Sequence, residues 1–208
     1  MNNILFLIIM IMDLIIPYFI AIPYKGYSHS KMVMSILGCK NSPLGTIYNF
    51  WMIISGIGIC LLGYNVFLYY SNENFVLAIT VFILILLYGV CDAIISGIFP
   101  LNEKKEDVTF SSKIHGIGSV IGFLALQFAP MFIAILEFKR GELLLGHILS
   151  VFFILSLISL IFFVIGEKPK FKNTVFALEG LWQRVLCIFM YAPLIVWIIH
   201  QNSNLFYT

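Results

Sequence analysis

Long apolar runs separated by short polar stretches dominate the chain. A hydrocarbon core about 30 Å thick needs about 20 apolar residues in a helix, and six runs reach or approach that length. They cover residues 4–21, 46–70, 75–100, 114–136, 143–166 and 181–199. Backbone groups in lipid need partners within their own segment, and no barrel-like alternation of polar and apolar residues is present. We therefore predict one all-α domain over residues 1–208, a polytopic membrane protein built as a six-transmembrane-helix bundle.

The polar connections between these runs divide into short and long ones. Residues 71–74 and 137–142 form tight turns. The longer connections, which are richer in polar residues, are 22–45, 101–113 and 167–184. Because loops alternate sides, the three long loops share one face of the membrane, and every lysine and arginine except Lys139 and Arg140 lies there. The positive-inside rule then predicts cytoplasmic long loops and both termini outside the cell membrane.

Composition agrees with this picture and narrows the function. Hydrophobic residues make up 61% of the 208 residues and charged residues only 11%, whereas soluble domains carry about 25% charged residues. The net charge of +2 is small and scattered, so nucleic-acid binding is not expected. The four cysteines are dispersed without a CxxC pair, so neither a disulfide scaffold nor a zinc site is expected. We expect membrane lipids as partners, and no cofactor or metal.

Small residues recur at four-residue spacing in several predicted helices. The pairs are Gly56/Cys60, Ala93/Gly97 and Gly118/Gly122. Such faces let helix backbones approach closely in lipid, where packing drives association. They favour a tightly packed bundle and leave open a helix partner from another chain.

Asp92 is the one charged residue between Phe75 and Pro100. A charge at this depth costs about 3 kcal/mol on insertion scales, so it usually has a partner or a function. Ser96 lies four residues later, on the same side of a helix. Further polar residues are expected at the same end of the bundle. Our candidate ligand-binding residues are Asp92, Ser96, Asn102, His115, Gln183 and Arg184.

Three interpretations of this cluster remain open. In the first, a proton, Arg184 or His115 neutralises Asp92, which ties helices together. In the second, the cluster holds a polar headgroup at the mouth of an apolar cavity. In the third, Asp92 and His115 act as an acid–base pair or as metal ligands, although a metal site usually needs three protein ligands and no HxxxH or HExxH spacing is present.

Two other polar residues lie deep in predicted helices. Asp13 interrupts the first apolar run and either faces the same interior as Asp92 or marks a polar helix contact. Gln127 lies beside Pro130, and we expect its side chain to bond backbone groups freed by a proline kink.

Several short motifs, taken in order, resemble a known family. They are Ser35-x-Leu37-Gly38, Ser42-Pro43, Asn49, Asp92-x-x-x-Ser96-Gly97-x-Phe99-Pro100, His115 and Gly180-Leu-Trp-Gln-Arg184. Together they resemble the bacterial and archaeal integral membrane family called domain of unknown function 998, which is similar to the six-helix superfamily that includes Sfk-like and autophagy-modulator membrane proteins. The resemblance spans nearly the whole chain. It implies a six-helix membrane protein in which these positions are family features, and it assigns them no role.

We expect a protein that recognises or handles a lipid or another amphiphile in an intramembrane pocket. The first alternative is an intramembrane lipid-modifying enzyme, which would need Asp92 and His115 within hydrogen-bond or shared-metal reach. The second is a non-catalytic helper subunit of a membrane complex, which would expose a contiguous patch of small residues.

Overall fold

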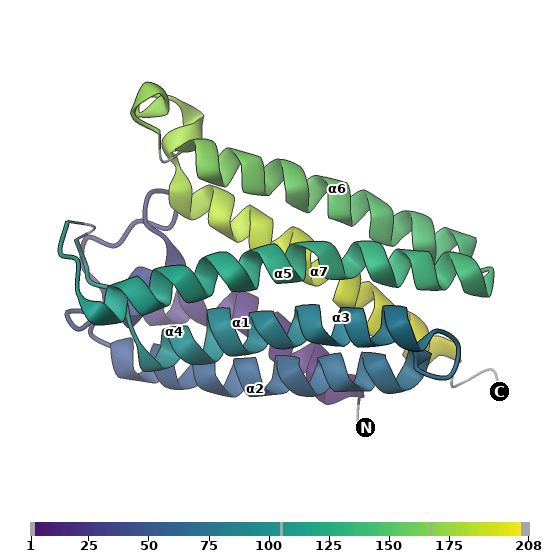
Figure 1. Ribbon diagram of the computed structural model, residues 1–208. Helices are drawn as coiled ribbons and strands as arrows, with labels where there is room; N and C mark the ends of the chain where they lie inside the picture. Colours follow the sequence, from purple (N-terminus) through teal and green to yellow (C-terminus); the bar gives the residue numbers. More distant parts are fainter. Residues whose placement is uncertain (1–2, 105, 167, 205–208) are drawn as a thin grey trace.

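The computed structural model describes residues 3–104, 106–166 and 168–204, and this part of the chain contains helices but no strands (Figure 1). Six helices are long and apolar enough to cross a membrane. They are α1 (Asn3–Ala21), α2 (Gly45–Tyr70), a composite helix over Phe75–Ile98, α5 (Phe110–Arg140), α6 (Leu143–Gly166) and α7 (Glu179–Asn204). The predicted all-α, six-helix membrane fold is confirmed. The predicted domain 1–208 also includes residues 1–2, 105, 167 and 205–208, which lie outside the described residues.

Local capping explains where several helices begin and end. Asn74 begins the composite helix, because its side chain accepts a 3.0 Å hydrogen bond from the Leu77 backbone N–H. Thr109 and Ser112 form a capping box that starts α5 at Phe110, before the expected residue 114. Gly141, with a φ of 83°, ends α5 in the left-handed conformation that glycine adopts easily, beyond the expected residue 136.

The third crossing is a composite of three helical segments. These are α3 (Phe75–Leu87), the π-helical segment η2 (Tyr88–Ile94) and α4 (Ile95–Ile98). A π-helical turn holds an extra residue, and such bulges are frequent at functional sites. Asp92 lies within it. The crossing ends at Ile98, two residues before the expected end at Pro100.

Glycines allow close packing on both sides of η2. A Cβ atom at Gly56 of α2 would lie 2.7 Å from the Gly89 carbonyl oxygen, and one at Gly122 of α5 would lie 2.5 Å from the Asp92 Cβ. Real Cβ contacts are not this short, so helices α2 and α5 approach η2 through glycine. The small residues found in the sequence therefore serve packing within this chain, and a helix partner from another chain stays a prediction.

The connections sort to the two ends of the bundle. In Figure 1 the short turns after α2 and α5 lie at one end, and the three long connections lie at the other. The long connections contain the 3-10 helices η1 (Met34–Gly38), η3 (Pro169–Phe171) and η4 (Val175–Ala177). We call this the long-loop end. Helices α5 and α6 lie close together at the short turn and diverge toward the long-loop end.

Gly122→Ala should lower the thermal stability of the purified protein, because the added methyl group meets the backbone and Cβ of Asp92. Overpacking of this kind typically costs about 1–3 kcal/mol. Gly116→Ala is the matched control. Gly116 lies on the same helix, and a Cβ atom there meets nothing within 4 Å. Equal melting temperatures of the two variants in detergent would show that α5 does not need glycine to pack on η2.

Candidate functional site

A cavity of about 640 Å³ lies at the long-loop end, between α5, α6 and the start of α7. Most of its wall is apolar. The apolar residues from the two diverging helices are Val120, Phe123, Leu124, Leu160, Phe163 and Val164. Val120, Leu124 and Val164 are 61%, 47% and 48% exposed although they line the cavity. The cavity therefore opens sideways between α5 and α6, and we call it the lateral cavity.

The lateral cavity exists because α6 changes its partner along its length. From the short turn to about its middle α6 packs on α5 (Figure 1), and there Gln127 Nε2 donates to Ser156 Oγ at 2.7 Å and to the Phe153 carbonyl at 3.3 Å. Farther along, α6 leans on the other side, where the rings of Phe162 and Trp182 lie 4.7 Å apart. The expectation that Gln127 bonds backbone freed by Pro130 was wrong, because its amide bonds the neighbouring helix.

The rim of the lateral cavity is charged. Lys31, Lys104 and Lys113 line it, and within the described residues none of the three takes part in an ion pair. Glu103, Asp107 and Glu179 line it as well, and the first long loop donates hydrogen bonds to the Glu103 carboxylate. Asn41 Nδ2 donates to it at 2.6 Å and Tyr24 Oη at 3.0 Å, and these hydrogen bonds hold the pKa of Glu103 below its usual range.

Arg184 is buried at 6% exposure, and its contacts are with the first long loop rather than with Asp92. Its Nη1 donates to the His29 carbonyl at 2.6 Å and to the Gly180 carbonyl at 2.8 Å, and its Nη2 donates to Tyr27 Oη at 2.7 Å. The interpretation in which Arg184 neutralises Asp92 is therefore wrong. The guanidinium group instead fixes the backbone of the loop.

The residues before Arg184 bind the same loop. Gln183 Oε1 accepts a 2.6 Å hydrogen bond from the Met34 backbone N–H, and the Leu181 N–H donates to the Ser30 carbonyl at 2.9 Å. The loop held in this way contributes Lys31, Met32, Val33, Ser35 and Ile36 to the lateral cavity. The motif Gly180–Arg184 thus positions one wall of the cavity, and Gln183 itself lines it.

His115 and Asn102 also line the lateral cavity while holding loop backbone. His115 Nδ1 lies 3.0 Å from the Phe99 carbonyl, so this nitrogen carries the proton and donates. Asn102 Nδ2 donates to Thr109 Oγ1 at 3.0 Å and to the Asp107 carbonyl. No hydrogen bond joins His115 to Asp92 in the described part of the chain. The acid–base pair of the enzyme alternative is therefore not assembled.

Asp92 lines a second, smaller cavity of about 30 Å³, which we call the carboxyl pocket. Asp13 lies in the same pocket, as one of the two interpretations of that residue expected. Asp92 lies beside the hydroxyl groups of Tyr88 and Ser119, and Ser119 Oγ is 3.4 Å from Ser96 Oγ. Ser96 therefore belongs to the surroundings of Asp92, although it lines neither cavity.

The predicted site residues thus fall into two adjoining places. Asn102, His115 and Gln183 line the lateral cavity, and Asp92 lines the carboxyl pocket. Ser35, Phe123 and Gln183 line both and separate one from the other. Among the described residues no group of three or more His, Cys, Asp or Glu side chains is placed to hold a metal ion.

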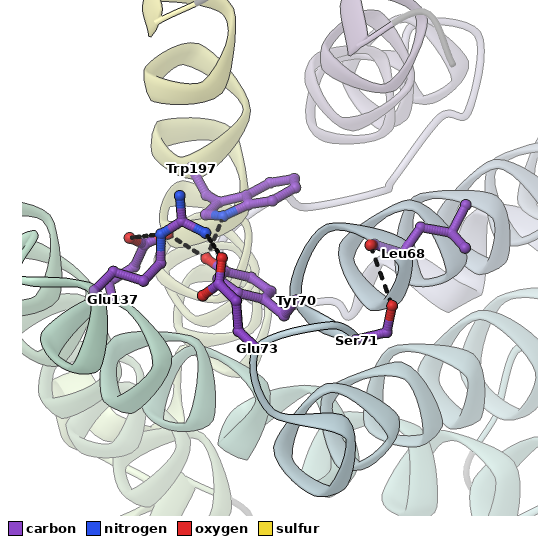
Figure 2. A network of polar contacts seen from close by, with 7 residues as sticks. Leu68, Tyr70, Ser71, Glu73, Glu137 and Trp197 are labelled. Atoms are coloured by element: carbon purple, nitrogen blue, oxygen red, sulfur yellow. Dashed lines mark hydrogen bonds and ion pairs between the residues drawn. The ribbon is translucent and has the colours of Figure 1, made fainter.

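A third polar cluster lies near the short turns and was missed in the sequence (Figure 2). Glu137 of α5 is fully buried, and Tyr70 of α2 donates to its carboxylate. Trp197 Nε1 of α7 donates to Tyr70 Oη at 2.6 Å. Arg140 pairs with Glu73 and lies 3.7 Å from Glu137. The Tyr70 hydroxyl group therefore joins α2 to α5 and α7, and the sequence pattern had placed Glu137 in the tight turn 137–142.

A family model described as "Protein of unknown function (DUF998)" matches residues 7–200 of this chain. No curated protein and no solved structure matches this chain.

Tyr70→Phe should lower the thermal stability in detergent, because it leaves Glu137 and the Trp197 indole without their shared partner. Leaving a buried polar group unsatisfied costs about 1–3 kcal/mol. Tyr64→Phe, on the same helix and 44% exposed, is the matched control and should melt as the wild type does. An unchanged melting temperature for Tyr70→Phe would contradict a stabilising role of this cluster.

Proposed function

The chain belongs to the DUF998 family, and from the geometry of its lateral cavity we propose that this membrane protein binds a lipid with an anionic headgroup there. The observation that carries the proposal is the combination of an apolar cavity, open sideways between α5 and α6, with a lysine-bearing rim at the long-loop end. An acyl chain fits the apolar wall, and a phosphate-bearing headgroup fits the rim.

Size and shape support this ligand class. Small-molecule sites usually enclose about 300–1,000 Å³ with mostly apolar walls and a few polar groups, and the lateral cavity has about 640 Å³. The exposed side chains Val120, Leu124 and Val164 continue its wall onto the lipid-facing surface. A lipid can therefore slide in from the bilayer without leaving the membrane.

Three lysines at the rim support an anionic headgroup, although Glu103, Asp107 and Glu179 line the same cavity. Among the described residues Lys31, Lys104 and Lys113 form no salt bridge, and the charge of Lys104 acts on the Glu103 carboxylate, which accepts from Asn41 and Tyr24. Clusters of basic residues near a membrane surface attract anionic lipids by about 1 kcal/mol per residue. Arg184 and Gln183 support this arrangement indirectly, because they fix the loop that carries Lys31.

We further propose that the protein lies in the cell membrane with its long-loop end in the cytoplasm. Nearly all lysines and arginines lie at that end, which is the bias of the positive-inside rule. Anionic lipids are concentrated in the cytoplasmic leaflet, which agrees with the proposed ligand. The likeness to the Sfk-like and autophagy-modulator superfamily stays a prediction.

Leu160→Trp should weaken lipid binding, because the larger ring fills the lateral cavity. We expect at least a tenfold loss for spin-labelled phosphatidylglycerol in nanodiscs, which corresponds to about 1.4 kcal/mol. Ile161→Trp, on the exposed side of the same helix, is the matched control and should bind as the wild type does.

The combined variant Lys31→Gln, Lys104→Gln, Lys113→Gln should retain the folded bundle and lose the preference for phosphatidylglycerol over phosphatidylcholine. Equal binding of both lipids by the wild type would contradict an anionic ligand. Unchanged binding by Leu160→Trp would contradict the lateral cavity as its place.

Membrane orientation can be read by cysteine labelling in intact cells. Lys139→Cys, at the end of α5, should react with a membrane-impermeant maleimide from outside, and Lys113→Cys should react only after permeabilisation. The native cysteines are buried or half-buried, and the unsubstituted protein measures their background. The reverse labelling pattern would place the long loops outside.

A further inference from the structure

Asp13 and Asp92 lie at the two ends of a chain of tyrosine hydroxyl groups that the proposed lipid does not use. Tyr191 Oη donates to Asp13 Oδ2 at 2.6 Å, and the hydroxyl oxygens of Tyr191 and Tyr88 are 2.8 Å apart. Tyr88 in turn lies against Asp92. The four side chains come from α1, α7 and η2, and all of them line the carboxyl pocket.

The number of hydroxyl hydrogens decides how this row of four side chains is protonated. Two of its links are hydrogen bonds, between Tyr191 and Asp13 and between Tyr88 and Tyr191, and the third is the contact of Tyr88 with Asp92, but each hydroxyl group supplies only one hydrogen. If both carboxyl groups were ionised, Tyr191 would donate to Asp13 and Tyr88 would donate to Tyr191. Tyr88 would then have no hydrogen for Asp92, and the ionised carboxylate would face the lone pairs of the Tyr88 oxygen. One additional proton, on either carboxyl group, fills every link.

The surroundings offer no other counter-charge. Asp92 is 6% exposed, and no lysine or arginine is among the residues that line the carboxyl pocket. An unpaired carboxylate so deep in apolar surroundings usually takes up a proton. A volume of about 30 Å³ leaves room for roughly one water molecule, so an organic cation does not fit.

The other titratable groups near the pocket do not replace this proton. Tyr48 of α2 and Cys187 of α7 line it, and both residue types are ordinarily neutral at pH 7. Arg184 of α7 is held by loop carbonyl groups, and His115 of α5 is bonded to Phe99. From these contacts we infer that Asp13 and Asp92 form a binding site for a single proton, which they share through Tyr88 and Tyr191.

The proton site opens toward the lateral cavity and is closed at its other end. Ser119 lies beside Asp92 and also lines the lateral cavity, so its hydroxyl group can pass a proton between them. At the far end Trp51 Nε1 donates to Asp13 Oδ1 at 2.8 Å, and an indole N–H is a donor only. Ser55, the other neighbour of Asp13, donates to the Met52 carbonyl at 3.1 Å. The hydroxyl groups of Tyr191, Tyr88 and Ser119 therefore connect the proton site to the lateral cavity.

Infrared difference spectroscopy of the full chain in lipid nanodiscs, stepped through pH in H₂O and D₂O, tests this site. It detects the C=O stretch of a protonated carboxyl group. In the wild type we expect one such group from the pair at neutral pH, and its band should be absent from the double variant Asp13→Asn, Asp92→Asn. Glu137→Gln is the matched control, because it removes the buried carboxyl group of the other polar cluster and leaves the band in place.

Single variants test the sharing itself. In Asp13→Asn the remaining carboxyl group should lose its proton at a lower pH than the pair does, by about one pH unit or more, as for strongly interacting groups. Tyr191→Phe keeps both carboxyl groups but removes the hydroxyl group that links them. It should therefore replace the shared titration of the pair by separate titrations of Asp13 and Asp92. No pair-dependent band at neutral pH, or a titration that Tyr191→Phe leaves unchanged, would overturn the inference. Tyr191→Phe decides the question even if the double variant does not fold.

Discussion

A polar group buried in lipid must find its partner within the protein, and this constraint organises the whole bundle. Water is absent from the hydrocarbon region, so an unsatisfied donor or acceptor there costs several kcal/mol. The chain meets most of this requirement by joining helices through buried polar side chains, while Gln127 Oε1, Glu137 Oε2 and His115 Nε2 have no hydrogen-bond partner in the described structure. Gln127 joins α5 to α6, Tyr70 joins α2 to α5 and α7, and Asp13 joins α1 to α2 and α7.

The same constraint gives the two ends of the bundle different properties. Near the short turns, Glu137, Tyr70 and Trp197 lock three helices together. At the long-loop end, Arg184, Gln183, His115 and Asn102 bond loop backbone instead, and α5 and α6 are free to diverge. The lateral cavity forms where these helices are not joined. An end with joined helices and an open end therefore follow from where the polar side chains find their partners.

The fold could be predicted from the sequence because hydropathy alone decides which segments cross the membrane. The number of helices and the end of the bundle at which each loop lies follow from the lengths of the apolar runs. The position of Asp92 and Ser96 on one side of their helix follows from helical spacing. The helix ends were predicted less accurately where a capping side chain sets them, as Thr109 does for α5. The π-helical segment around Asp92 leaves no mark in the hydropathy pattern.

The candidate site was predicted only in part, for a physical reason. Arg184 has two suitable kinds of acceptor, a carboxylate and loop carbonyl groups, and the sequence does not show how close the first long loop comes. Tyr88 and Tyr191 are ordinary members of apolar runs, and only the packing of η2 on α7 brings their hydroxyl groups together. Glu137 ends an apolar run and resembles a turn residue, although it is fully buried.

Native mass spectrometry of protein extracted gently from its own membrane tests most directly whether the lateral cavity holds an anionic lipid. We expect a mass increment of one lipid with an anionic headgroup, retained at collision energies that strip the bulk lipid. Lipid-free protein under the same conditions, or a retained mixture that mirrors the bulk membrane, would contradict it.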